Sequence, residues 1–226
     1  GLLRVAQGVS ARQAASWTYS GLLVLLGVLL GSRLGYLLWH PAYLQSMGMQ
    51  ALAPLAGGYN WPGAVAGGWL AMGVVVWSKR LRFLNAADRL IPLLPPLAIT
   101  VWLGCWVAGC AYGVQVPAAG WLPLSLDETG AYVARVPLQW LAALSLLVLY
   151  FALENRFPER RPGQPAALSW LLFAGHTLLF SWLRADLRPQ WKGLPWDIWA
   201  ALACVLLGVV LCLLVFWPSH SVEKLA

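Results

Sequence analysis

Residues 17–39 read WTYSGLLVLLGVLLGSRLGYLLW, a run of 23 residues that is apolar almost throughout. Its only charged residue is Arg33. A helix needs about 20 predominantly apolar residues to cross a bilayer, so the stretch predicts a membrane-spanning helix. Trp17 and Trp39 stand at its two ends, where an indole ring is typical of the membrane–water interface.

The rest of the chain has the same composition. Of its 226 residues, 60% are hydrophobic and 10% are charged, whereas a soluble domain carries roughly 25% charged residues. This excludes a soluble globular domain, and the low polarity excludes a disordered chain. The formal net charge of +7 is spread over the ends of apolar segments, so we expect no nucleic-acid binding. The chain is therefore predicted to be an all-α, polytopic integral membrane protein.

We expect a single transmembrane domain over residues 1–226, with six spans. Each span is an apolar segment bounded by loops that carry most of the charge. The approximate spans are residues 17–39, 59–77, 90–117, 137–153, 167–183 and 198–217.

Lysine and arginine predict the orientation, because they are enriched in cytoplasmic loops. Alternate loops are rich in them, which places residue 1 in the cytoplasm and returns the C-terminus, with Lys224, to the same side. The fifth loop breaks this pattern with Arg184, Arg188 and Lys192, partly balanced by Asp186 and Asp197. We interpret this exception as a polar site on the outer side.

Arg33 is predicted to reach the same side. It precedes Trp39 by six residues, about 9 Å along a helix, so its side chain can extend outward. With Arg184 and Asp186 it would form a site for an anionic lipid headgroup, since arginine binds phosphate in a bidentate manner. The alternative is a structural ion pair of Asp186 with Arg33 or Arg184.

Glycines recur at a spacing of four, which lets helices approach closely in a membrane. The sets are Gly27, Gly31 and Gly35, then Gly63 and Gly67, then Gly109 and Gly113. We expect tight helix packing at each set, with a lipid-headgroup cleft as the alternative. Packing alone explains the pair Gly57–Gly58, ahead of the second span, less well.

The cysteines do not predict a metal site. Cys105 and Cys110 would point about 140° apart on a regular helix, and Cys204 and Cys212 would lie roughly 12 Å apart along it. Neither pair can form a disulfide within a regular helix, so simple packing is favoured. A helix break at Gly109 would bring Cys105 and Cys110 together, and a redox pair stays open as the alternative.

His176 lies well inside the fifth span. An ionisable group at that depth is a functional candidate. We favour a hydrogen bond to a neighbouring helix, and the alternative is contact with a haem or another pigment.

Several segments, in order and spacing, resemble the prolipoprotein diacylglyceryl transferase family over roughly residues 17–208. They are GSRLGYLLW (31–39), GGYNWPGAVAG (57–67), AADRLIP (86–92), LGCWVAGCAYG (103–113), RVPLQW (135–140) and FSWLRAD (180–186). The resemblance implies a seven-helix fold whose first helix precedes Gly1. It also implies transfer of a diacylglyceryl group from phosphatidylglycerol to a cysteine of a secreted lipoprotein precursor.

The resemblance keeps many positions of the family pattern. Arg33, Tyr36, Gln139, Arg184 and Asp186 become candidates for binding a lipid headgroup. The matching glycines, which would pack helices or line a cleft, are Gly57, Gly58, Gly63, Gly104, Gly109 and Gly113. Asp88 is also retained.

The positions that would carry the family's chemistry are replaced. The catalytic histidine falls on Pro62 and the signature arginine falls on Trp102. The signature asparagines and glutamate fall on Cys105, Ala108 and Cys110. Further changes place Val136, Ala142 and Ser181 at polar positions of the pattern.

Two functions follow from these matches and departures. The favoured hypothesis is a transferase-like protein that has lost catalysis and serves as a structural or lipid-binding subunit of a larger membrane complex, of a respiratory or photosynthetic type. The alternative is an active, divergent phosphatidylglycerol-dependent transferase acting on lipoprotein cysteines. Both place the protein in a bacterial inner membrane. We expect phosphatidylglycerol or a similar lipid to bind, and no cofactor.

Overall fold

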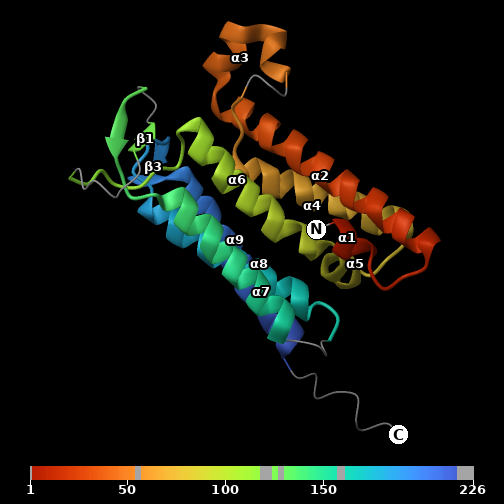
Figure 1. Ribbon diagram of the computed structural model, residues 1–226. Helices are drawn as coiled ribbons and strands as arrows, with labels where there is room; N and C mark the ends of the chain where they lie inside the picture. The colour runs from red at the N-terminus through yellow and green to blue at the C-terminus, as the bar shows by residue number, and fades with distance from the viewer. Residues whose placement is uncertain (1, 54–56, 118–123, 127–129, 157–160, 218–226) are drawn as a thin grey trace, which may run out of the picture. The chain divides into compact units, whose positions relative to one another are not determined.

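The computed structural model describes residues 2–53, 57–117, 124–126, 130–156 and 161–217, and most of them are helical (Figure 1). Lys224, which entered the charge pattern, lies outside this part of the chain. The chain divides into two compact units, Gly1–Leu93 and Leu94–Ala226, which are described separately below.

The regular elements of the first unit that the structure describes are all helices, organised around one antiparallel pair, α2 and α4. Its elements are α1 (Leu2–Ala6), α2 (Ala11–Trp39), α3 (Pro41–Met47), the 3₁₀ helix η1 (Gly48–Leu52), α4 (Trp61–Lys79), α5 (Phe83–Leu90) and the 3₁₀ helix η3 (Ile91–Leu93).

Glycines hold α2 and α4 in backbone contact, as their spacing predicted. A Cβ atom on Gly31 would stand 2.7 Å from the Cα of Gly67, and a Cβ on Gly63 would stand 3.0 Å from the Cα of Gly35. A Cβ on Gly27 would lie 2.7 Å from the carbonyl oxygen of Gly67. No larger residue fits at these crossings, so the prediction of tight packing is confirmed for the first two glycine sets.

A small apolar core covers the end of this helix pair at which α2 begins and α4 ends. Val5, Val75, Leu90 and Leu93 are buried together, and Trp17 packs against them. Short elements α1 and η3 thus cover the end of the pair at which α2 begins.

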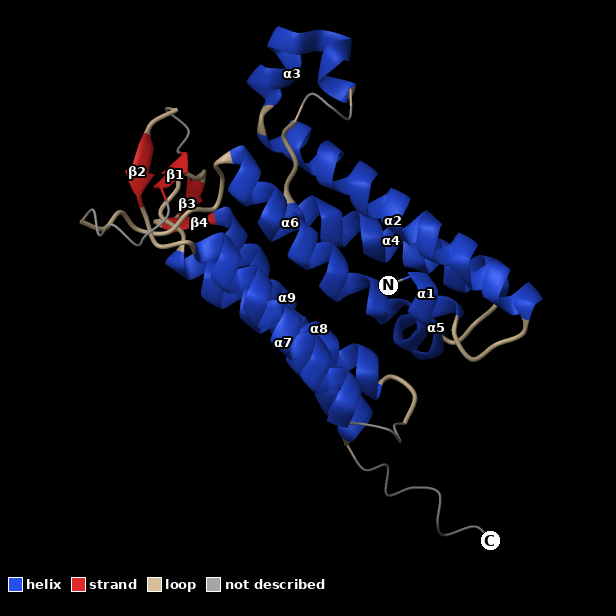
Figure 2. Cartoon of the chain, viewed as in Figure 1, coloured by secondary structure: helices blue, strands red, loops and turns tan. Residues whose placement is uncertain are grey.

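In its described residues the second unit contains four long helices and two short antiparallel hairpins. Its elements are α6 (Leu94–Ala108), β1 (Leu124–Leu126), β2 (Tyr132–Ala134), α7 (Leu138–Arg156), α8 (Gln164–Leu183), β3 (Gln190–Trp191), β4 (Leu194–Pro195) and α9 (Trp196–Phe216). Within it α6 packs on α7, α7 on α8, and α8 on α9. The hairpins gather at one end of these helices (Figure 2). In β1–β2 Leu124 pairs with Ala134, and in β3–β4 Gln190 pairs with Pro195.

Each predicted span contains a helix, and the protein is a polytopic membrane protein. In the described residues, four helical segments are long and apolar enough to cross a bilayer: Ala11–Trp39, Phe83–Ala108, Gln164–Leu183 and Trp196–Phe216. Leu138–Leu153 is a shorter apolar helix. The count of six spans stays a prediction.

The third predicted span, residues 90–117, extends too far. Helix α6 ends at Ala108, and Gly109 has a positive φ of 69°. The following residues pair with the strand region instead: Val116 N donates to Ala134 O, and Val136 N donates to Val114 O. The apolar sequence continues past Ala108, but its backbone there forms hydrogen bonds with a neighbouring segment instead of continuing the helix.

Candidate functional site

Arg33 projects from the last turns of α2 and is 5% exposed. Its Nε donates to the carbonyl oxygen of Ala51 in η1 at 2.9 Å, and its Nη2 donates to the same oxygen. Its Nη1 donates to the carbonyl oxygen of Gly58 at 2.7 Å. The side chain thus reaches the segment that follows α2, where it is buried; its position on the outer side of the membrane stays a prediction. The segment after α2 folds back and covers the guanidinium with protein backbone.

Three tyrosines surround this guanidinium. Its Cζ lies 5.9 Å from the ring centre of Tyr36, and 5.7 Å from those of Tyr43 and Tyr59. Ring faces at this range attract a cation. We call Arg33 with Tyr36, Tyr43 and Tyr59 the Arg33 cage.

No carboxylate of the described residues pairs with Arg33. Carbonyl dipoles and tyrosine rings stabilise the cation but do not neutralise it. A buried charge without a counter-ion costs several kcal/mol. The Arg33 cage is therefore suited to an anion.

Gly57 and Gly58 shape the wall of this cage through their backbone. Both have positive φ, 71° and 75°, a conformation that glycine adopts without steric cost. A Cβ on Gly58 would also stand 2.7 Å from Cδ1 of Tyr36, so a side chain there would displace the ring. These two constraints explain why glycine occupies positions 57 and 58, which helix packing alone did not explain.

The start of α4 holds no titratable group at the position that the family pattern assigns to the catalytic histidine. Asn60 caps the helix by accepting a hydrogen bond from Gly63 N at 2.8 Å, and its own backbone N donates to Ser32 O. Pro62 sits in the first turn, where its missing N–H costs nothing. Its role in the described structure is to begin a helix.

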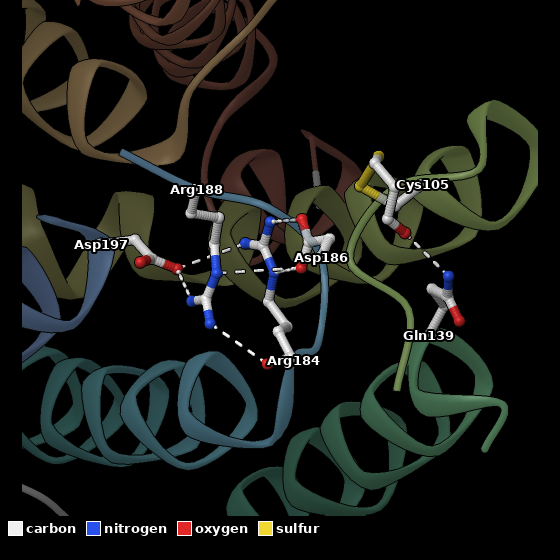
Figure 3. The surroundings of a disulfide bond; sticks show 7 residues. Cys105, Gln139, Arg184, Asp186, Arg188 and Asp197 are labelled. Atoms are coloured by element: carbon white, nitrogen blue, oxygen red, sulfur yellow. Dashed lines mark hydrogen bonds and ion pairs between the residues drawn. A yellow bond between two sulfur atoms is a disulfide. The ribbon is translucent and has the colours of Figure 1, made fainter. Parts of the chain in front are cut away.

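In the second unit, Cys105 and Cys110 form a disulfide, with their Cα atoms 4.7 Å apart (Figure 3). Simple packing of these two residues, the favoured interpretation, is wrong. The alternative, a helix break at Gly109 that brings the two cysteines together, is confirmed, because α6 ends at Ala108 and Gly109 has a positive φ. Cys204 and Cys212 are free thiols on α9.

Gln139 fixes the chain after the disulfide. It is fully buried at the start of α7, and its Nε2 donates to the carbonyl oxygen of Cys110 at 2.7 Å (Figure 3). Its Oε1 is buried without a hydrogen-bond partner. The structure thus places Gln139 against the protein backbone; binding of a lipid headgroup by this residue stays a prediction.

None of the three glycine positions expected to pack α6 against another helix shows that packing in the described residues. A Cβ on Gly113 would lie 2.9 Å from the Cβ of Val136, but Gly113 is in the non-helical segment and contacts a loop. Gly109 ends the helix. A Cβ added to Gly104 would have no heavy atom of a described residue within 4 Å, apart from its own helix backbone and its chain neighbours. Helix packing at Gly109 and Gly113 is therefore wrong, because the helix does not reach them.

Arg184 and Asp186 form the core of a second polar cluster, just after α8. Arg184 Nε donates to Asp186 Oδ1 at 2.9 Å and Nη2 donates to Oδ2 at 2.5 Å. Arg188 Nη1 donates to Asp197 Oδ2 at 2.7 Å and to the carbonyl oxygen of Ser181. Arg184 Nη1 also reaches Asp197 at 3.4 Å. We call Arg184, Asp186, Arg188 and Asp197 the Arg–Asp cluster (Figure 3).

The Arg–Asp cluster neutralises itself, with two guanidiniums facing two carboxylates. Burial alone would lower the pKa of Arg184, but the hydrogen bond to Asp186 and the charges of Asp186 and Asp197 outweigh it. The pKa of Arg184 is therefore raised above its ordinary value. The predicted Arg184–Asp186 pair is confirmed as an ion pair.

Sequence reasoning noticed Arg188 and Asp197 as loop charges but did not place them in the site. The excess of basic residues in the fifth loop was the signal that could have done so. The predicted headgroup site combined Arg33 with Arg184; these residues belong to different units, and their joint action stays a prediction.

His176 bonds to a neighbouring helix, as expected. Its Nε2 lies 2.9 Å from Ser145 Oγ and 3.2 Å from the carbonyl oxygen of Ala142, both on α7. Its ring stacks on Phe180 at 4.4 Å. Trp102 packs edge-on against His176 and Phe180, so the position of the family's signature arginine is part of an apolar core. Contact of His176 with a pigment stays untested.

Among the residues that the structure describes, no group of three or more His, Cys, Asp or Glu could hold a metal ion. The described residues thus form a helical membrane protein with two polar sites at helix ends: in one, no described carboxylate neutralises the cation, and the other is internally paired.

Comparison with known proteins gives this architecture a family. The family model for prolipoprotein diacylglyceryl transferase matches residues 4–214, and the chain belongs to that family. Similar proteins are the phosphatidylglycerol–prolipoprotein diacylglyceryl transferases of Burkholderia mallei (strain SAVP1), Burkholderia pseudomallei (strain 668) and Burkholderia thailandensis. Each is 31% identical over 179 residues, which is 77% of this chain and 58% of the relative. The chain thus spans little more than half the length of these relatives.

Proposed function

We propose that this protein transfers a diacylglyceryl group from phosphatidylglycerol to the cysteine thiol of a secreted lipoprotein precursor. Membership of the family supports this proposal, as do relatives whose names carry the same activity. The sequence alone favoured a protein that has lost catalysis; we now prefer the alternative, an active transferase. We place this reaction in a bacterial inner membrane.

The observation that carries the proposal is the unneutralised guanidinium of Arg33. Three of its donor groups bind carbonyl oxygens, and a guanidinium has five N–H bonds, so donors remain for a phosphate. Arg184 differs, because Asp186 and Asp197 already satisfy its charge. Of the two predicted phosphate-binding arginines, Arg33 is therefore the one we assign to the lipid headgroup.

A cation at this position would also assist the reaction. When the thiol sulfur attacks the glycerol carbon, negative charge develops on the departing glycerol phosphate. A preorganised donor aimed at such a charge contributes a factor of about 10² to 10³ in rate. The buried guanidinium of Arg33 is held by Ala51 and Gly58 and needs little reorganisation to act.

The disulfide supports the side of the membrane on which this would occur. Disulfides persist in oxidising compartments and are rare in the cytosol. The Cys105–Cys110 bond joins the last turn of α6 to the segment after it, at the helix end that the charge pattern predicts to be on the outer side. Lipoprotein precursors present their cysteine on that side.

The test uses the full chain reconstituted into vesicles of phosphatidylglycerol, with a synthetic lipoprotein peptide that contains one cysteine. Mass spectrometry detects the thioether adduct. We expect transfer by the unsubstituted protein, and a loss of about 10²-fold or more in Arg33→Gln. Arg12→Gln is the matched control, because it removes the same charge at an exposed position of α2. Full activity in Arg33→Gln would refute the assignment, and inactivity of the unsubstituted protein would refute the function.

A second function has its own support. Pro62, Trp102 and the Cys105–Cys110 disulfide occupy positions that the family pattern gives to titratable or polar side chains, and Trp102 is part of an apolar core. These observations favour a lipid-binding subunit without catalysis. Native mass in mild detergent separates the two ideas. A stoichiometric assembly with other membrane proteins, together with no adduct in the vesicle assay, would support the subunit.

A further inference from the structure

His40 follows α2 directly and shares a face with Arg33 and Tyr36. The three residues have the spacing i, i+3 and i+7, which places their side chains in one row along a helix. The imidazole stacks on the ring of Tyr36, with centroids 4.1 Å apart and an angle of 21° between planes. Tyr36 is itself a wall of the Arg33 cage. His40 therefore lies one aromatic ring away from the proposed phosphate site.

The hydrogen bonding of His40 defines its tautomer. Nδ1 lies 3.0 Å from the carbonyl oxygen of Tyr36. A carbonyl oxygen can only accept, so Nδ1 carries the hydrogen and donates it. Nε2 then keeps its lone pair and acts as an acceptor. The side chain is half-buried, and Nε2 has no partner among the described residues.

Among the described charged and titratable groups, Tyr36 contacts this imidazole. Arg33 and Tyr43 in turn lie against Tyr36, and Tyr59 lies against Arg33. None of these four groups is a carboxylate. The other histidine of the described residues, His176, already uses its Nε2 against α7. His40 is therefore the histidine whose geometry suits proton abstraction.

We propose that His40 is the general base for the transfer reaction, an inference that rests on the proposed function. Nε2 accepts the proton of the substrate thiol while the sulfur attacks the glycerol carbon of phosphatidylglycerol. A sulfur–carbon bond forms, and the bond from that carbon to the phosphate oxygen breaks. The electron pair leaves on the phosphate beside Arg33. The imidazolium then gives its proton to water or to the released glycerol phosphate.

This assignment resolves the conflict at Pro62. Proline cannot take a proton, so a base from the start of α4 is excluded. His40 instead comes from the end of α2 and reaches the same region, because Tyr36, on which it stacks, contacts Gly58 in the segment that leads into α4. The base is supplied by the helix opposite the one that the family pattern suggests.

The experiment compares two peptides, one with cysteine and one with selenocysteine at the acceptor position. A selenol is far more acidic than a thiol and is ionised at neutral pH, so it needs no base. His40→Asn places an amide N–H near the position of Nδ1 and can keep the bond to the Tyr36 carbonyl, but it has no basic nitrogen. We expect it to slow transfer to the cysteine peptide by about 10²–10⁴-fold. Transfer to the selenocysteine peptide should fall by much less.

Each outcome decides between explanations. An equal loss with both peptides would overturn the assignment in favour of a structural role, and unchanged transfer would overturn it outright. Native mass spectrometry of bound phosphatidylglycerol provides a second readout: His40→Asn should retain the lipid, whereas Arg33→Gln should lose it. Lipid loss in His40→Asn would also contradict the role. No transfer by the unsubstituted protein to either peptide would refute the proposed function, and the base with it.

Discussion

Arg184 binds the carboxylate of Asp186 with two hydrogen bonds, from Nε to Oδ1 and from Nη2 to Oδ2. The two residues are separated by Ala185 alone, whose backbone N donates to the carbonyl oxygen of Tyr112 at 2.9 Å. The backbone between the two members of the pair is thus bound to the segment that follows the disulfide. Its geometry is that of a structural connection within the second unit.

Removing Asp186 should destabilise the second unit. Asp186→Ala would leave two guanidiniums, of Arg184 and Arg188, facing the single carboxylate of Asp197 in a site where these side chains are 10–17% exposed. Breaking a buried ion pair costs about 3–5 kcal/mol, and partial exposure should reduce this to about 2–3 kcal/mol. The check is the thermal midpoint of the purified protein in detergent. Lys192→Ala, at an exposed position of the same loop, should leave the midpoint unchanged; an equal fall in both variants would contradict the role of Asp186.

Glycine substitutions should have opposite effects at two positions of the same helix pair. Gly31→Ala places a Cβ 2.7 Å from the Cα of Gly67, so α2 and α4 must separate at a cost of about 1–3 kcal/mol. Gly73→Ala is the control on α4, where no described heavy atom outside its helix lies within 4 Å of the new Cβ. It should stabilise by up to about 1 kcal/mol through helix propensity. Thermal unfolding of both variants in the same detergent tests the contrast, and a similar midpoint for the two would argue against backbone contact at Gly31.

The sequence was informative where membrane helices follow simple rules. Apolar length placed helices in all six predicted spans, and the spacing of Gly27, Gly31, Gly63 and Gly67 predicted the close crossing of α2 and α4. Arg33 and Arg184 stood out because a charge near the end of a membrane helix needs a partner. Each rule depends on local spacing along one chain segment, which a sequence displays directly.

The features that escaped prediction depend on contacts between distant segments. The apolar run after Ala108 has the same hydropathy whether it continues a helix in lipid or pairs with residues 134–136 inside protein. The end of α6, and with it the disulfide, was therefore not determined by composition. Arg33 is covered by Ala51 and Gly58, from a segment that carries no charge to predict this contact.

Thiol labelling should distinguish two classes of cysteine. The chain has four cysteines, of which Cys105 and Cys110 are joined and Cys204 and Cys212 are free. Denaturation without reductant followed by alkylation should therefore modify Cys204 and Cys212 alone, and prior reduction should make all four reactive. Mass spectrometry counts the adducts. Modification of Cys105 or Cys110 without reductant would contradict the disulfide.

Loss of the disulfide should have a modest effect on stability. It closes a short loop, with a sequence separation of 5, and the entropy of such a loop corresponds to about 2 kcal/mol. The double substitution Cys105→Ser with Cys110→Ser should lower the thermal midpoint accordingly. Cys204→Ser with Cys212→Ser is the matched control, with the same chemistry on α9 and no bond to break. A larger fall in the control would show that the midpoint reports side-chain burial.

The contact between α7 and α8 offers a prediction about coupling. The carbonyl oxygen of Ala142 can only accept, so a hydrogen on Nε2 of His176 is shared between it and Ser145 Oγ. Nδ1 of His176 is then a buried acceptor without a partner. Ser145→Ala should therefore destabilise by about 0.6–1.5 kcal/mol. His176→Phe should cost little more, because it removes the unpaired nitrogen along with the bond.

The double variant of Ser145→Ala and His176→Phe should be less destabilised than the sum of the two single variants, since both remove the same hydrogen bond. Thermal midpoints of the four proteins, measured at one protein and detergent concentration, complete the cycle. Strict additivity would show that Ser145 and His176 do not interact. A coupling of about 0.6 kcal/mol or more would establish that the histidine within α8 stabilises the contact between the helices, whatever else binds to the protein.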